Sequence, residues 1–165
     1  YPPMSPLSTL IQQYAAYDRW ANAAFVDRLN EEPDALLDRH AASSFPTLRG
    51  TLMHIRDAEN AWFLRLTGAT MRWPAEPTQE LDTLMPHVDR FTGYARSLDE
   101  EGLLATCRYH DLKGNPYAQP AWQMIMHALN HSSYHRGQVV TQMRALGLDR
   151  IPRTDLVAFQ RLAGA

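Results

Sequence analysis

One stretch of the sequence decides the fold, and it reads AWQMIMHALNHSSYHRGQVVTQMRAL over residues 121–146. Its apolar residues recur every three or four positions, which is the period of an α-helix with one buried stripe. The helix follows Pro120, and Gly147 ends it. The stripe is formed by Ile125, Leu129, Val139, Met143 and Leu146. A helix of this length with one apolar face needs other helices to cover that face.

Three further segments show the same helical period. They are residues 6–29, which open at Pro6; residues 48–66, which follow Ser44 and precede Gly68; and residues 77–98, which open at Pro77. Pro86 lies inside the third of these segments and should kink or split that helix, so we expect a bend near Met85. Four long helices with compact connections predict an antiparallel bundle.

Shorter elements connect these helices. Pro33 opens a helical turn that ends at Leu37, and a last short helix is expected from Thr154, its cap, to Leu162, with Asp155 in the first turn. Between residues 106 and 119 the apolar residues alternate around the turn sequence KGNP, which is typical of a β-hairpin. We therefore predict an all-α four-helix bundle with a short β-hairpin insertion between helices three and four, as a single domain over residues 1–165.

The composition limits the classes of protein that fit. The chain has 165 residues, of which 45% are hydrophobic, and a formal net charge of −2. Its 16 basic residues are dispersed among 18 carboxylates, which argues against a nucleic-acid partner. No apolar run approaches the ~18 residues of a membrane-spanning helix, and no secretory segment is evident. Because Cys107 is the only cysteine, we expect a reducing, cytoplasmic setting, away from membranes.

Three of the seven histidines lie one turn apart on the predicted helix of residues 121–146. His127, His131 and His135 follow one another at spacings of four, so they share one helix face. His127 and His135 lie roughly 12 Å apart along the axis, whereas metal–nitrogen bonds are about 2.1 Å, so all three cannot share one ion. The ion would bind either His127 with His131 or His131 with His135. His54, beside the apolar stripe of another helix, is the candidate third ligand.

Each histidine also has an interpretation without metal. A lone histidine beside an apolar stripe, such as His54, is usually a hydrogen-bonded core residue. Stacked histidines can also hydrogen-bond within a polar stripe at the surface. His40, His87 and His110 lie near the ends of elements or in loops, and we expect them to face solvent.

The motif Asn130-His131-Ser132-Ser133-Tyr134-His135-Arg136-Gly137-Gln138 resembles the NHxxxHRGQ signature of the DinB/YfiT-like superfamily of helical metalloproteins. Other segments resemble the same family in the same order: residues 14–22, 52–55, 111–116 and 146–156. The resemblance thus covers nearly the whole chain. It implies a four-helix bundle, often dimeric, that holds a divalent metal on His54, His131 and His135.

Several other residues are expected near these ligands. They are Asp57, His127, Asn130, Tyr134 and Arg136, which would orient substrate or water. Glu59 is expected to form an ion pair at the surface, and Gly137 to permit close helix packing.

Three neutral imidazoles leave coordination positions open, as in catalytic metal sites. Imidazole suits zinc, nickel or iron, so a divalent transition metal is the expected cofactor. Because members of the superfamily include thiol-dependent S-transferases, the resemblance implies a metal-dependent enzyme that activates a small thiol for S-transfer or detoxification of a small-molecule substrate. A low-molecular-weight thiol would be its cosubstrate, and a homodimer its expected assembly. The alternatives are a metal-dependent hydrolase and a non-catalytic, stress-related metal-binding dimer.

Overall fold

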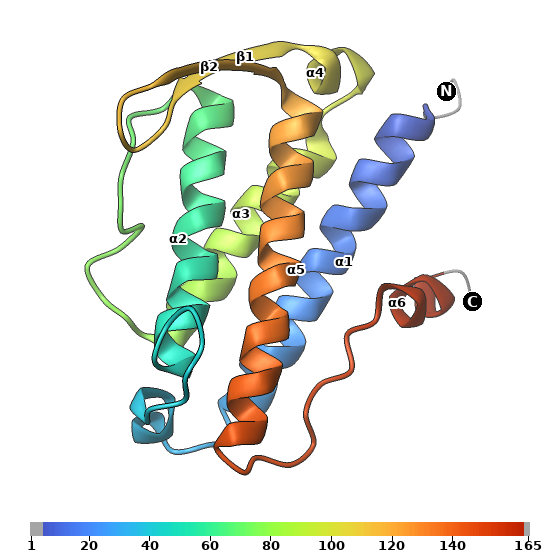
Figure 1. Cartoon of the computed structure of the whole chain (residues 1–165). Coiled ribbons are helices and arrows are strands. Elements are labelled where there is room, and N and C mark those ends of the chain that lie inside the picture. Colours follow the sequence, from blue (N-terminus) through green and yellow to red (C-terminus); the bar gives the residue numbers. More distant parts are fainter. Residues whose placement is uncertain (1–4, 164–165) are drawn as a thin grey trace.

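Four long helices form the body of the molecule in a computed structural model, which describes residues 5–163 (Figure 1). In chain order the elements are α1 (Pro6–Leu29), the 3-10 turn η1 (Asp34–Asp38), α2 (Leu48–Thr67), the 3-10 turn η2 (Leu81–Thr83), α3 (Leu84–Ser97), α4 (Glu100–Leu104), β1 (Thr106–His110), β2 (Pro116–Pro120), α5 (Ala121–Ala145) and α6 (Leu156–Ala163). The predicted helical bundle with a hairpin before its last long helix is confirmed. Among the described residues, no helix combines the length and apolar character needed to cross a membrane.

The four long helices are not all antiparallel, although the sequence predicts an antiparallel bundle. Asn60 of α2 accepts a hydrogen bond from Arg90 of α3. About one turn further along both helices, the rings of Phe63 and Tyr94 lie 5.6 Å apart. The helices α2 and α3 therefore run in the same direction. The connection at residues 68–80 explains this arrangement, because it returns along the length of the bundle (Figure 1).

The third long helix differs from its prediction for a local reason. Residues 77–80 are not helical, and the segment begins at Leu81 as a 3-10 turn before α3 starts at Leu84. Pro86 therefore lies in the first turn of α3 and not in a helix interior, where it was expected to cause a bend. Proline is tolerated in a first turn because the amides there have no acceptor within the helix.

Caps account for the other boundaries. Thr47 caps α2 by accepting a hydrogen bond from the amide of Gly50, so the helix begins after Thr47. Helix α4 was not predicted; its first turn is capped by Asp99, whose carboxylate accepts from the amide of Gly102. The last helix starts later than expected, because the Asp155 carbonyl accepts its first hydrogen bonds. The first turns of these helices thus begin at the group that accepts from their free amides.

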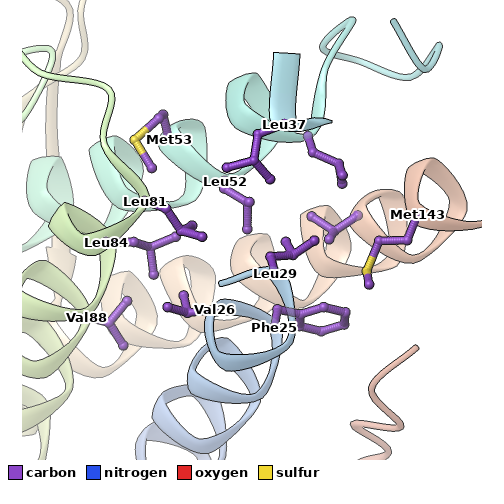
Figure 2. Packing of buried hydrophobic residues seen from close by; sticks show 12 residues of the cluster. Phe25, Val26, Leu29, Leu37, Leu52, Met53, Leu81, Leu84, Val88 and Met143 are labelled. Carbon is purple, nitrogen blue, oxygen red and sulfur yellow. The ribbon is translucent and has the colours of Figure 1, made fainter. Parts of the chain in front are cut away.

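The apolar core consists of two clusters, one toward each end of the bundle. The cluster in Figure 2 gathers side chains from α1, α2, α3 and α5, including Phe25, Leu52, Val88 and Met143. The other cluster lies closer to the hairpin and is formed by residues such as Ile11, Phe91, Leu103, Met124 and Ile125. Burial of these side chains holds the four helices together.

Buried polar residues lie between the two apolar clusters. Glu59 of α2 is fully buried and accepts a hydrogen bond of 2.5 Å from the Ser132 hydroxyl of α5. Asp18 of α1, also fully buried, accepts one from the Arg136 guanidinium of α5 and one from Asn22. The expected surface ion pair of Glu59 is therefore wrong. Burial and the neighbouring Asp18 carboxylate raise the pKa of Glu59 well above its ordinary value of 4.5.

We predict that Glu59→Gln is at least as stable to unfolding as the parent at pH 8. This difference in the free energy of unfolding should become smaller toward pH 5. Because the folded protein raises the pKa of Glu59, the parent loses stability as pH rises above about 4.5, the value in the unfolded chain. Glutamine has the shape of the protonated acid and does not ionise. Urea unfolding at both pH values measures the difference.

The matched control is Glu59→Ala, which removes the partner of Ser132 and leaves a cavity. It should lose about 1–3 kcal/mol at both pH values. If Glu59→Gln were as destabilised as Glu59→Ala at pH 8, the carboxylate charge itself would be required and the protonated form would be the wrong assignment.

Candidate metal centre

The three histidines that the family resemblance selected lie together between α2 and α5. The Nε2 atom of His131 is 3.1 Å from Nε2 of His54 and 3.1 Å from Nε2 of His135. One nitrogen from each ring lies within 4.8 Å of the others. His131 and His135 are one turn apart on α5, and His54 faces them from α2. Spacing along α5 alone left two pairs open, and the position of His54 favours the pair His131 and His135.

This arrangement fits a metal ion by the chemistry of its donors. Three neutral imidazoles that turn Nε2 toward one point direct three lone pairs at one another, and a cation satisfies all three. Bonds of about 2.1 Å in tetrahedral geometry place ligand nitrogens about 3.4 Å apart, close to the separations seen here. The set contains no carboxylate, so a divalent ion would keep its full charge there. The ligation itself stays a prediction.

Burial favours the neutral form, which binds metals, at two of the rings. Burial, together with the neighbouring His135, His54 and His127, lowers the pKa of His131 to about 4. Burial and His135 also lower the pKa of His54. His54 and His131 are partly exposed, whereas His135 is buried. The cluster therefore opens to solvent on the side of His54 and His131.

Gln138, which was not among the predicted site residues, fixes the orientation of His135. The side-chain oxygen of Gln138 lies 2.8 Å from Nδ1 of His135, and its amide donates to the Ser44 hydroxyl at 2.7 Å. When Nδ1–H donates to this oxygen, the lone pair of Nε2 is left free to bind a metal, as second hydrogen-bond partners do in metal sites. The signal was present in the sequence, because Gln138 closes the motif that begins at Asn130.

Aromatic rings surround the histidine cluster. The ring centroids of Phe45 and His54 lie 4.6 Å apart, and those of Trp73 and His54 lie 6.0 Å apart. Tyr134 contacts His135 at 5.0 Å and is 63% exposed. Phe45, Trp73 and Tyr134 thus form an aromatic rim beside the histidine cluster.

The other predicted neighbours divide into two groups. His127 lies 6.0 Å from the His131 ring but packs against Trp62 at 4.8 Å, outside the cluster, and Asn130 is exposed. Arg136 points away from the metal centre into the core, where Asp18 binds it. Its expected role beside the ligands is therefore corrected to a structural one.

Asp57 anchors a loop and does not join the ligands. Its carboxylate accepts hydrogen bonds from Arg56 at 2.9 Å and from the amide of Ala75 at 3.0 Å. This contact fixes the segment that carries Trp73 to the rim. Asp57 therefore acts on the cluster through loop position and through its charge, which favours the protonated form of His54.

The remaining histidines lie elsewhere. His40 and His110 are exposed, as expected. His87 was expected in solvent but is buried between α3 and the loop at residues 68–80, where its Nε2 lies 2.8 Å from the Glu76 carboxylate. Its burial results from the return of that loop along the bundle, which spacing within the sequence does not reveal.

Comparisons with known proteins agree with the fold. The sequence model of the DinB family matches residues 4–164. Protein DinB of Bacillus subtilis is 23% identical over 147 residues, which cover 82% of this chain and 86% of that protein. The solved structure of a DinB-like protein from Bacillus cereus aligns with a TM-score of 0.59 and 21% identity, covering 84% of this chain and 91% of that one.

We predict that His131→Ala abolishes stoichiometric binding of a divalent transition metal. His131 supplies one of the three nitrogens, so its loss leaves only two ligands, His54 and His135. Elemental analysis of protein purified without a histidine tag measures the metal content. His127→Ala is the matched control and should keep the metal, because His127 lies outside the cluster. Equal metal affinity in His131→Ala and the parent would contradict the assignment.

We also predict that Gln138→Ala lowers metal affinity by about 10–100-fold, because the His135 ring loses the partner that orients it. Competition with a chromophoric chelator measures this affinity. Ser44→Ala, which leaves Gln138 in place, should cause a smaller loss. An unchanged affinity in Gln138→Ala would show that helix packing alone holds the His135 ring.

Proposed function

This chain belongs to the DinB family, and from that premise we propose that it is a metal-dependent enzyme that activates a small thiol for S-transfer. The observation that carries the proposal is the convergence of His54, His131 and His135 at the partly exposed junction of α2 and α5. Zinc, nickel or iron(II) suits such a set of imidazoles. The thiol reaction comes from the family resemblance and is a proposal for this chain.

The donor set supports catalysis more than a structural role. Structural zinc sites are usually closed by four protein ligands, often cysteines, whereas this cluster offers three histidines. A divalent ion held there would lower the pKa of a coordinated thiol or water and so supply a nucleophile at neutral pH. The chain's own part is to hold three neutral rings in place, with Gln138 fixing His135.

The proposed reaction is a substitution at an electrophilic carbon. The thiol R–SH loses its proton to solvent, the sulfur electron pair forms a new S–C bond, and the leaving group departs with the pair from the bond that breaks. The rim formed by Phe45, Trp73 and Tyr134 excludes part of the solvent around that carbon. The protein's own Cys107 does not serve as the nucleophile, because burial raises the pKa of its thiol. Cys107 also lies on β1 and not among the three histidines.

We predict that protein loaded with zinc, nickel or iron(II) consumes low-molecular-weight thiols in the presence of alkylating electrophiles. Thiol loss and product mass, followed over a panel of thiols and electrophiles, measure the activity. His131→Ala should lose it, because that variant lacks the metal. His127→Ala should retain metal and most of the turnover.

Two other outcomes would each overturn S-transfer. Turnover of an ester panel without thiol consumption would identify a metal-dependent hydrolase. No turnover on either panel, together with a melting temperature that collapses when a chelator removes the metal, would identify a structural ion.

A further inference from the structure

Two residues of the motif face away from the metal centre. Successive residues of an α-helix are rotated by about 100°, so Arg136 and Gly137 lie on the side of α5 opposite His131 and His135. There α5 lines a cavity of about 330 Å³ together with α1 and the segment before α6. The residues around it are Tyr17, Ser133, Arg136, Gly137, Val140, Arg144, Ile151, Pro152, Arg153, Thr154 and Asp155. Its size is in the range of small-molecule sites.

Gly137 is exposed in the wall of this cavity. A Cβ atom built at Gly137 would meet nothing within 4 Å, so the close packing expected from the sequence is wrong. Glycine within a helix is less stable than alanine. No helix contact offsets this cost at Gly137. What the missing side chain provides is free space in the wall of the cavity.

The cavity is positively charged. Three arginines line it, but Asp18 already pairs with Arg136, so the charges of Arg144 and Arg153 are set against the single carboxylate of Asp155. Arg136 is 3% exposed and is held rigidly by Asp18 and by the Ser133 hydroxyl at 2.9 Å. Arg144 and Arg153 are exposed, and neither forms an ion pair with any carboxylate in residues 5–163. A ligand with negative charge would satisfy both side chains.

Part of the remaining wall is apolar, and one segment of it is anchored to α1. Val140, Ile151 and Pro152 contribute carbon surface. The Tyr17 hydroxyl donates to the Thr154 carbonyl at 2.7 Å, and this bond holds the segment at residues 151–155 against α1. The cavity therefore combines an anchored segment, an apolar surface and exposed arginines.

We propose that this cavity is a second binding site, separate from the metal centre, for a small molecule that carries a carboxylate or phosphate on an apolar body. Arg144 and Arg153 bind the anionic group. The space beside Gly137 and the apolar wall accept the body. The site lies behind α5, so its ligand does not contact the three histidines.

Phenyl phosphate and benzoate are the probes, and benzyl alcohol is the neutral control. Calorimetric titration at low ionic strength should detect saturable binding of at least one anionic probe at one site per chain, and much weaker binding of benzyl alcohol. The preferred anion distinguishes a phosphate ligand from a carboxylate ligand. Arg144→Gln and Arg153→Gln should each weaken binding by about tenfold, and both should fold normally because the side chains are exposed.

Gly137→Leu should place a side chain in the wall of the cavity and weaken binding without lowering the melting temperature, since leucine favours the helix and its Cβ meets no neighbour. Arg39→Gln removes another exposed arginine, which forms no ion pair within residues 5–163 and lies far from the cavity in the sequence, and it should bind like the parent. All these variants should keep their metal content.

Three results would overturn the proposal. Equal binding of benzyl alcohol and the anionic probes would remove the role of charge. Equal losses in Arg39→Gln and Arg144→Gln would indicate nonspecific attraction. A dimer that dissociates in Arg144→Gln and Arg153→Gln while no probe binds would assign this surface to a second copy of the chain.

Discussion

The contact between α2 and α5 is the interaction on which the rest of the structure depends. Buried polar pairs join the two helices at successive levels: the Thr51 hydroxyl donates to Gln142 at 2.8 Å, and Ser132 donates to Glu59. Each pair is worth little by itself, but a slip of one turn, about 5.4 Å, would leave every member unpaired in the core. The register fixed in this way also brings His54 opposite His131.

Much of the bundle was predictable because helices and hairpins are encoded locally. The period of the apolar residues gave α1, α2 and α5 nearly to the residue, and the KGNP turn gave the hairpin. The direction of α3 was not predictable in this way, because it depends on the path of residues 68–80 across the bundle. The burial of Glu59 and His87 was missed for the same reason, since their partners, Ser132 and Glu76, are set by tertiary contacts.

The candidate site shows the same division between local and distant information. A spacing of four placed the histidines of α5 on one face, yet spacing alone left their pairing open, because the deciding residue, His54, lies on another helix. The motif also placed adjacent residues on different faces of α5. His135 faces α2, whereas Arg136 reaches Asp18 in the core. Arg136 therefore lies on a different side of α5 from His135, although the two residues are adjacent in the motif.

The buried ion pair between Asp18 and Arg136 has a consequence for synthesis of the chain. A ribosome releases residues in order, so the Asp18 and Glu59 carboxyls emerge well before the guanidinium that shares their site. Until α5 leaves the exit tunnel, α1 and α2 cannot enclose these groups without leaving a charge unpaired in apolar surroundings. The N-terminal half is therefore kept from closing on itself early, and final compaction waits for the helix that carries the metal-binding motif.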